Sequence, residues 1–192
     1  MDFSTIKKVF IPEGEVKQIT RNGAVIWKGG YTNLVPTSQD NAGNIFNGTG
    51  YQDGYRLSSS GGLSAQDDTT TTGFILYTPG QVIRMAGVEW FPTVTGRNHY
   101  LAFYDANFAV LGSINCYIST ANASGYAATS RGIVTHKTTN TVGNADNHPT
   151  KDANGVFTFD HFGFTNSSAV KYFRINGCGS GADMIVTLDE EI

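Results

Sequence analysis

Apolar and polar side chains alternate along several short stretches of the chain, as expected of β-strands whose two faces differ. Leu101 and Phe103 alternate with Tyr100, Ala102 and Tyr104. The same period of two residues relates Phe157 to Phe159, Phe173 to Ile175, and Met184 to Val186 and Leu188. Each of these stretches therefore predicts a strand that places at least one face against a core.

Ten short stretches are candidates for strands, and turn residues separate them without a helical pattern in between. They lie at 32–35, 54–58, 73–78, 81–90, 100–105, 109–114, 131–136, 155–160, 171–176 and 182–189. Many short strands divided by turns are typical of an antiparallel β-sandwich. The sequence therefore predicts an all-β fold.

Four long connections interrupt this series, at 36–53, 59–72, 91–98 and 115–154. Loops of this length in a compact domain are usually functional or mobile. In the second of them, Asp67 and Asp68 precede four consecutive threonines, and this polar run predicts an exposed loop tip. We therefore expect a rigid sheet framework that carries variable loops.

A small hairpin is predicted near the N-terminus, where Asn22-Gly23 separates two β-rich runs. Asn-Gly favours a two-residue type I′ turn, because both central residues take positive φ. This turn predicts four cross-strand pairs: Arg21 with Ala24, Thr20 with Val25, Ile19 with Ile26, and Gln18 with Trp27. A preceding strand at 7–11 would complete a three-stranded meander.

A hinge is predicted at Gly29-Gly30, after the hairpin. It divides the chain into an N-terminal hairpin module at 1–30 and a larger domain at 31–192. Three short strands need an apolar face packed on another element. We therefore expect the larger domain or a neighbouring subunit to cover the hairpin.

The composition agrees with an all-β class. The chain of 192 residues has 23 Gly, 22 Thr and 15 Asn but 7 Leu, and 15% of its residues are charged. Turn and strand formers thus outnumber helix formers. With 40% apolar and 12% aromatic residues, a chain of this length can bury a sizeable core without metals or disulfides.

The charge and the cysteine content exclude some partners. A net charge of −3, without a basic cluster beyond Lys7-Lys8, argues against nucleic acid. No apolar run approaches the roughly 20 residues of a membrane span, and the N-terminal segment has no signal-peptide core. We expect a protein folded in a cytoplasm, without membrane insertion. Cys116 and Cys178 are then expected to be free thiols, with a disulfide as the alternative.

The sequence has no motif of a catalytic centre: G-x-S-x-G, H-E-x-x-H, C-x-x-C and the P-loop are all absent. His99, His136, His148 and His161 lack the spacing of a zinc site. Loop carboxylates are plentiful, but no glycosidase pair can be assigned from their positions. We therefore predict a protein that is not an enzyme and has no cofactor.

Two loops have the composition of a cation site. The segments Asp152-Ala153-Asn154-Gly155 and Asp40-Asn41-Ala42-Gly43-Asn44 combine oxygen ligands with a glycine for a tight turn. Neither fits the twelve-residue EF-hand pattern, and Asx turns explain both equally well. A structural calcium ion is therefore the alternative interpretation of these loops.

Polar and aromatic side chains of the loops suit the recognition of a sugar, because flat rings contact C–H groups while amides, carboxylates and guanidinium groups bond to hydroxyls. We predict a glycan site formed by Tyr51, Asp53, Tyr55, Arg56, Trp90, Arg97, His99 and Tyr126. Tyr51 and Tyr126 lie on polar loops and are expected to be exposed. Trp90 also fits core packing, and Arg56 also fits a position at a sheet edge.

Three positions have predicted roles in the scaffold. Pro79-Gly80 predicts a tight turn, and Asp105-Ala106-Asn107 predicts a hairpin turn held by side-chain bonds to the backbone. Arg174 lies inside an apolar strand. Because an unpaired buried charge is costly, Arg174 should reach the surface or pair with a carboxylate, for which Asp183 is the candidate.

Two parts of the chain resemble proteins of bacteriophage tails. The segment KKVFIPEGEVKQITRNGAVIWK, at 7–28, resembles a module at the start of many tail-associated structural proteins of phages and prophages of gut Firmicutes. The segments at 72–90, 100–114 and 171–192 are similar to jelly-roll modules of tail-fibre and receptor-binding proteins. They have a Pro-Gly turn, a Tyr-Asp-x-Asn hairpin and a final Tyr-x-Arg-Ile strand in similar order.

This resemblance implies a jelly-roll β-sandwich at 31–192 that binds a bacterial surface polysaccharide without catalysis. It implies a virion tail protein, assembled in the host bacterial cytoplasm, that acts outside the cell and contacts other tail proteins. The hairpin module would attach the protein or hold it in a homotrimer. Two alternatives stay open, a purely structural tail or decoration protein and a glycan depolymerase.

Overall fold

The computed structural model describes residues 10–11, 14–15, 18–21, 24–28, 31, 33–35, 50–91, 97–118, 126–132, 134–136, 150–160, 162–164 and 166–192. The chain divides into two compact units, Met1–Thr32 and Asn33–Ile192. The predicted hinge at 29–30 lies outside the described residues. Among the described residues, no helix has the length and apolar character needed to cross a membrane.

The described residues of the first unit form two separate two-stranded sheets. β1 (Phe10–Ile11) pairs with β2 (Gly14–Glu15), and β3 (Gln18–Arg21) pairs with β4 (Ala24–Lys28). The predicted three-stranded meander is therefore wrong. The reason is local, because Ile11 lies opposite Gly14 and the first strand folds back on the segment that follows it.

The register of the β3–β4 hairpin departs from the prediction after two pairs. Arg21 lies opposite Ala24 and Thr20 opposite Val25, as predicted, but Ile19 pairs with Trp27 and Gln18 with Lys28. A β-bulge between Ile19 and Thr20 causes the shift, since one residue of β4 has no counterpart on β3. The turn residues 22–23 lie outside the described part of the chain.

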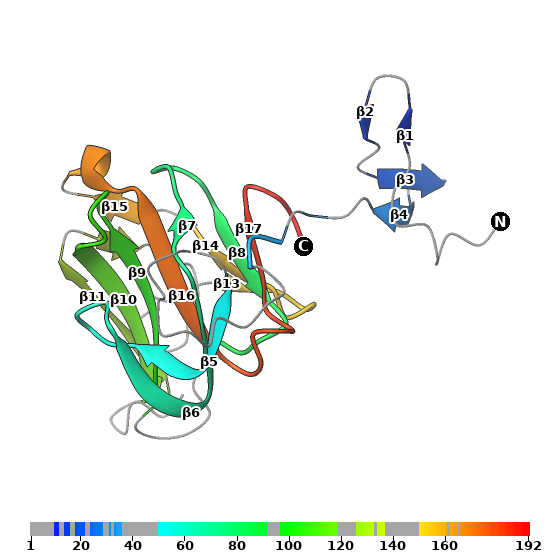
Figure 1. The fold of residues 1–192 in the computed structure, drawn as a ribbon. Helices are drawn as coiled ribbons and strands as arrows, with labels where there is room; N and C mark the ends of the chain where they lie inside the picture. Colours follow the sequence, from blue (N-terminus) through cyan, green and yellow to red (C-terminus); the bar gives the residue numbers. More distant parts are fainter. Residues whose placement is uncertain are drawn as a thin grey trace. The chain divides into compact units, whose positions relative to one another are not determined.

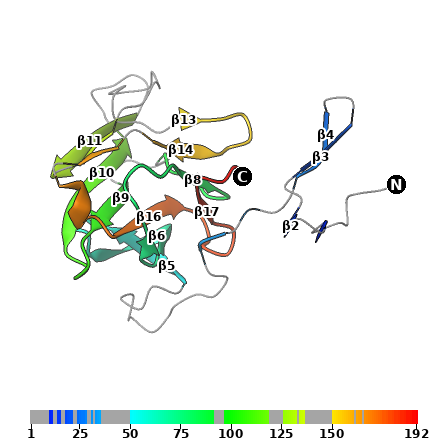
Figure 2. The same ribbon diagram turned by 90° about the horizontal axis from the view of Figure 1, so that it is seen from above.

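The described residues of the second unit form two main antiparallel sheets and one separate strand pair (Figures 1 and 2). The larger has the strand order β11-β10-β9-β16-β6-β5, with β7 also paired to β16. Its strands are β5 (Tyr51–Leu57), β6 (Leu63–Thr72), β7 (Ile75–Leu76), β9 (Asn98–Tyr104), β10 (Val110–Ile118), β11 (Tyr126–Gly132) and β16 (Tyr172–Cys178). The predicted all-β antiparallel architecture is thus confirmed.

The smaller sheet has the order β13-β14-β8-β17. Its strands are β8 (Ile83–Ala86), β13 (Thr150–Lys151), β14 (Phe157–Phe159) and β17 (Ile185–Leu188). A separate pair joins β12 (Val134–His136) to β15 (Phe162–Phe164), and the 3-10 turn η3 (Ser167–Ala169) precedes β16. The described residues of the candidate strand at 32–35 bond to β17, where Leu34 N donates to Val186 O at 2.9 Å, without forming a strand of their own.

The main core lies between the two sheets and confirms the alternation predicted from the sequence. Leu101 and Phe103 of β9 are fully buried in it. The other strands contribute Ile83 and Met85, Ile114 and Cys116, Phe157 and Phe159, Phe173 and Ile175, and Val186. Two inward faces of apolar residues are what hold a sandwich together.

The four consecutive threonines correct the prediction of a loop at 59–72, because they form the end of strand β6. Thr69, Thr70, Thr71 and Thr72 are all buried, with at most 1% of their surface exposed. Three hydroxyl groups have partners: Thr69 Oγ1 donates to Gln66 O at 2.6 Å, Thr71 Oγ1 donates to Tyr55 O at 2.7 Å, and Thr72 Oγ1 accepts from Ile175 N at 3.0 Å. Threonine is β-branched and fits a strand. The fourth hydroxyl, of Thr70, is buried without a hydrogen-bond partner among the described residues.

The predicted turns are confirmed where the structure describes them. Gln81 N donates to Thr78 O across Pro79-Gly80, and Asp105 Oδ1 accepts from the backbone N of Asn107 and of Ala109. Asp152 Oδ1 accepts from Asn154 N and Val156 N, so this loop is an Asx turn between β13 and β14. The second candidate cation loop, 40–44, lies outside the described residues. Cys116 and Cys178 are free thiols, as expected.

Candidate binding site

The outer face of β9 is also buried from Tyr100 to Tyr104, and the candidate site lies against it. Tyr100, Ala102 and Tyr104 of β9 alternate with the core residues and therefore point away from the smaller sheet. With Leu57 and Phe74 they form a second apolar cluster, against which Leu63, Phe108 and Tyr172 pack. The hairpin β5–β6 covers this cluster and contributes Leu57 and Leu63 to it.

The β5–β6 hairpin bends at its middle. Its open end is part of the large sheet, where Thr69–Thr71 pair with Asn176–Cys178 of β16. A bulge follows between Asp53 and Tyr55, where Gly54 has φ 79° and Asp68, on the other strand, has φ 57°. Such bulges bend a strand pair and increase its twist. Figure 1 shows the resulting curve of β6.

The tip of this hairpin is held against β9 and β10. Tyr104 Oη donates a hydrogen bond of 2.8 Å to Gly61 O, and Ser58 N donates to Gly62 O at 2.7 Å to close the turn. A Cβ at Gly61 would lie 3.0 Å from both Tyr104 Cε1 and Val110 Cβ, and Gly61 has φ 76°. A glycine is therefore needed where the tip meets the sheet.

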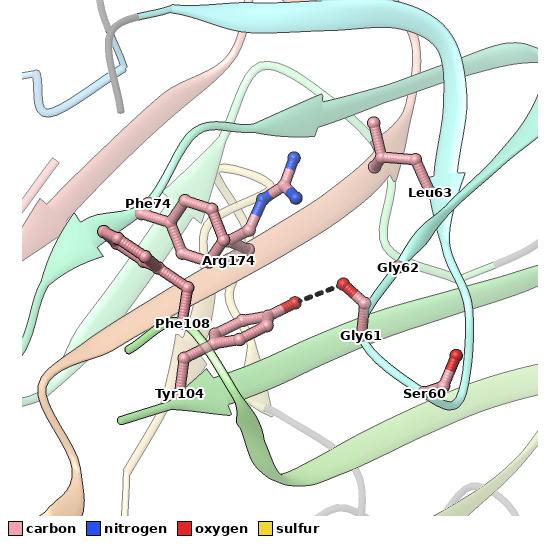
Figure 3. Close-up of a pocket in the computed structure, with 8 residues that line it drawn as sticks. All are labelled: Ser60, Gly61, Gly62, Leu63, Phe74, Tyr104, Phe108 and Arg174. Carbon is pink, nitrogen blue, oxygen red and sulfur yellow. Dashed lines mark hydrogen bonds between the residues drawn. The ribbon is translucent and has the colours of Figure 1, made fainter. Parts of the chain in front are cut away.

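A pocket of about 350 Å³ lies between the hairpin tip and the outer face of the sheet. It is lined by Ser60, Gly61, Gly62, Leu63, Phe74, Tyr104, Phe108 and Arg174. In Figure 3 the aromatic side chains lie on one side of the pocket and the hairpin residues on the other, with Arg174 between them. A concave site with apolar walls and few polar groups is typical of a small-ligand site.

Packed aromatic rings form the apolar wall. The ring centroids of Phe74 and Phe108 are 4.6 Å apart, and Phe108 stacks on Tyr172 at 5.0 Å with an interplanar angle of 27°. Phe74 meets Tyr104 edge to face at 4.8 Å. Phe108 has φ 62°, a backbone conformation that is strained for an aromatic residue. Such strain is concentrated at functional sites and is consistent with a binding role for this turn.

Arg174 is the charged group of the pocket, and neither of its predicted environments is found among the described residues. It is 3% exposed rather than at the surface, and the proposed partner Asp183 is itself exposed. Instead, Arg174 Nε donates to Thr72 O at 2.8 Å, and Cζ lies 4.8 Å from the centroid of the Phe74 ring. The backbone of Thr72 accepts this bond where the chain leaves β6 and before β7 begins. Burial lowers the pKa of Arg174 to about 10, so the guanidinium stays charged at neutral pH.

Three of the residues predicted to bind glycan lie in the protein interior. The predicted exposure of Tyr51 is wrong, because this residue is 7% exposed and belongs to the main core. Trp90 is fully buried in the same core, in agreement with the alternative interpretation. His99 is fully buried as well, with Nδ1 2.6 Å from Trp90 O. Burial lowers the pKa of His99 to about 4.

The other five predicted residues do not line the pocket, and three of them lie on strand β5 of the β5–β6 hairpin. Asp53 accepts from Gly181 N at 2.8 Å, and Arg97 forms an ion pair of 3.1 Å with Asp68. Tyr55 is 37% exposed on β5, where the neighbouring Arg56 is partly buried. Tyr126 is the first residue of β11, opposite Ile118. Of the seven predicted residues whose side chains the structure describes, none lines the pocket.

The pocket combines residues that the sequence places far apart. Ser60 to Leu63 fall in the predicted loop 59–72, whereas the other lining residues fall in or beside predicted strands and therefore resemble ordinary scaffold. The one signal in the sequence is Arg174, a charge inside an apolar strand. In the described part of the chain, no group of three or more His, Cys, Asp or Glu side chains is placed to hold a metal ion.

Comparison of the chain with models of protein families, with curated protein sequences and with solved structures gives no match.

The hydrogen bond from Tyr104 to the hairpin tip leads to a first prediction. The substitution Tyr104→Phe should lower the free energy of unfolding by about 1 kcal/mol, because it removes one buried hydrogen bond and leaves Gly61 O without its donor. Urea denaturation measures this loss. Tyr100→Phe is the control, since Tyr100 belongs to the same cluster but makes its hydrogen bond to Asn176 through its backbone N and not through its hydroxyl. Equal losses in the two variants would contradict the role of the hydrogen bond.

Proposed function

We propose that this protein is a non-catalytic receptor-binding component of a phage tail, and that its β-sandwich recognises a bacterial cell-surface glycan. The observation that supports this function best is the pocket between the β5–β6 tip and the outer sheet face. This pocket has a volume of about 350 Å³, and its lining combines aromatic rings with a buried guanidinium group.

The chemistry of the pocket suits a sugar. The pyranose ring presents C–H groups on its faces and hydroxyls around its edge, so it needs flat apolar surfaces together with a few hydrogen-bonding groups. Phe108, which is partly exposed, supplies a ring, and Ser60 at the hairpin tip supplies an exposed hydroxyl. Packing on both faces of the larger sheet makes the framework rigid, which reduces the entropic cost of binding.

The location in a tail rests on the resemblance of the segments at 7–28, 72–90, 100–114 and 171–192 to phage tail proteins. On the same basis we propose that the sandwich is of the jelly-roll type and that the protein acts outside the host cell. The N-terminal hairpin module would attach it to other tail proteins and support a homotrimer.

The oligomeric state can be tested on the full chain. Multi-angle light scattering should give three times the monomer mass of 20.6 kDa. A mass of 20.6 kDa at micromolar concentration would contradict the trimer, although it would leave the glycan-binding function open to its own test.

Glycan binding is tested with purified cell-wall polysaccharide of the host and with a glycan array. The wild-type protein should bind in a saccharide-dependent way, and Phe108→Ala should weaken binding about tenfold, because the sugar ring loses one stacking surface. Leu76→Ala is the matched control, since Leu76 is 69% exposed on β7 and lies outside the pocket. Thermal melting verifies that both variants fold.

The results also separate the alternative functions. A structural tail or decoration protein would bind no saccharide. Loss of binding in Tyr55→Ala but not in Phe108→Ala would move the site to the exposed side of the hairpin. Release of reducing ends from host polysaccharide would establish a depolymerase and overturn the non-catalytic assignment.

A further inference from the structure

Arg174 has hydrogen-bonding capacity that the protein does not use. Its Nε atom donates to Thr72 O, but its Nη2 atom is buried and has no hydrogen-bond partner among the described residues. The residue is 3% exposed and lines the pocket. A buried charged donor without an acceptor is unfavourable, and most such groups in proteins have a partner.

The described residues that line the pocket carry no negative charge to balance Arg174. Apart from the arginine they are one serine, two glycines, one leucine and three aromatic residues. The ring of Phe74 gives the guanidinium a cation–π contact at 4.8 Å, which is weaker than a pair with an anion. The protein thus presents a fixed positive charge in an apolar setting, which favours an anion over water more strongly than an exposed arginine would.

We infer that the pocket recognises saccharides that carry an anionic group, a carboxylate or a phosphodiester, which pairs with Arg174 while the sugar ring packs on Phe108. This inference rests on the proposed function, since it names the ligand class of the same pocket. The planar guanidinium matches the oxygens of either anion. The strands hold it in place, because Arg174 lies opposite Ala102 of β9, whose small side chain leaves it room.

The size and shape of the pocket agree with this class. About 350 Å³ lies at the lower end of ligand pockets, so the site suits one terminal sugar rather than a long chain. Figure 3 shows Arg174 between the aromatic side chains and the hairpin residues, so a sugar on the rings would bring its acidic substituent to the guanidinium. The Ser60 hydroxyl, which bonds to Ser58 Oγ at 2.8 Å, lies on the hairpin side and can meet a sugar hydroxyl.

The test uses the full chain and saturation-transfer NMR with three matched sets of probes. The first set contains sodium glucuronate, galacturonate and N-acetylneuraminate. The second contains the neutral sugars glucose, galactose and N-acetylglucosamine, and the third is the phosphodiester glycerophosphoglycerol. At least one anionic probe should bind about tenfold more tightly than the neutral sugars, and its affinity should fall as NaCl is raised.

Two arginine variants localise the effect. Arg174→Met should abolish the preference for the anionic probe, whereas Arg84→Met should leave it unchanged. Arg84 is the matched control because it lies on β8, outside the pocket, with Nη1 3.2 Å from Glu190 O. If Arg174→Met does not fold, Arg174→Lys provides the second variant. It keeps the charge but loses the planar fork, and the affinity for the anionic probe should then fall about tenfold.

Each result has a defined meaning. Binding of a uronate or of the phosphodiester identifies which anion the pocket prefers, and either supports the inference. Equal binding of neutral and anionic sugars, or an anion preference that survives in Arg174→Met, would overturn the inference and leave the proposed function standing. If no anionic probe binds, the inference is wrong. If host polysaccharide also fails to bind, the proposed function is wrong as well.

Discussion

Replacing Gly87 with alanine should destabilise the sandwich by about 3 kcal/mol or more. A Cβ at this position would overlap Asp183 O and lie 2.8 Å from Asp183 C. Both are backbone atoms just before β17, so no side-chain rotation relieves the overlap. The paired strands β8 and β17 would have to move apart, although Ile83 and Met85 of β8 are fully buried between the sheets.

Gly155 is the matched control for Gly87. The two residues have nearly the same φ, 78° and 80°, but a Cβ at Gly155 would have no heavy atom within 4 Å. Gly155→Ala should therefore lower the free energy of unfolding by only about 1 to 2 kcal/mol, which is the cost of a left-handed backbone conformation in a residue that has a Cβ. Urea denaturation of both variants separates the steric effect from the conformational one. Similar losses in the two would contradict the close approach of Gly87 to Asp183.

The stability of the domain should fall as the pH is lowered from about 6.5 to about 4, and His99 should account for about 3 kcal/mol of the fall. Burial lowers the pKa of His99 to about 4 in the folded protein from 6.5 in the unfolded chain. Between these values the unfolded state binds the proton and the folded state does not, so stability rises with pH across this window. Above pH 6.5 both states are neutral, and the effect ends.

The geometry around His99 explains the lowered pKa. Burial of the whole side chain has the largest effect, and it outweighs the raising effect of the hydrogen bond that Nδ1–H donates to Trp90 O at 2.6 Å. Arg97 and Arg56 lower the pKa further, against the raising effect of Glu89. The Nε2 atom of His99 has no hydrogen-bond partner among the described residues, so protonation there would add a buried charge without an acceptor.

The measurement is a series of urea denaturation curves between about pH 7.5 and pH 5. Carboxylates also titrate at lower pH, so the slope between about pH 6.5 and pH 5 is the useful part. The variant His99→Gln should be less stable at neutral pH but should lose most of this slope. A slope that stays the same in His99→Gln would show that other groups cause it and would contradict the assignment.

The strands that pack between the sheets can be predicted because their residues alternate in polarity. Leu101 and Phe103 already predict β9, and the same holds for β14 and β16. Strand β6 escapes such a prediction because its buried half contains only threonine, which gives no contrast between two faces. Its burial depends on hydroxyl partners such as Tyr55 O and Ile175 N, which a sequence cannot bring together.

The candidate site can be predicted only in part. Binding residues are expected on loops, and Ser60 to Leu63 do lie in a predicted loop. The rest of the pocket comes from β9, β16 and the turn of Phe108, where the residues resemble ordinary scaffold. In the sequence Trp90 and His99 have the character of binding residues because they flank a loop, yet the fold turns both into the interior.

From Tyr100 to Tyr104, strand β9 is apolar on both faces, and this affects how the register of the sheet is determined. A shift of β9 by one residue would exchange its two faces, and because both are apolar the hydrophobic effect gives little preference for the observed register. Hydrogen bonds between polar groups must determine the register instead. Asn176 Oδ1 accepts from Tyr100 N at 2.7 Å, and a shifted strand would leave both groups unpaired in a dry interior. The side-chain amide of Asn176 on β16 therefore favours the observed register of β9 over a register shifted by one residue.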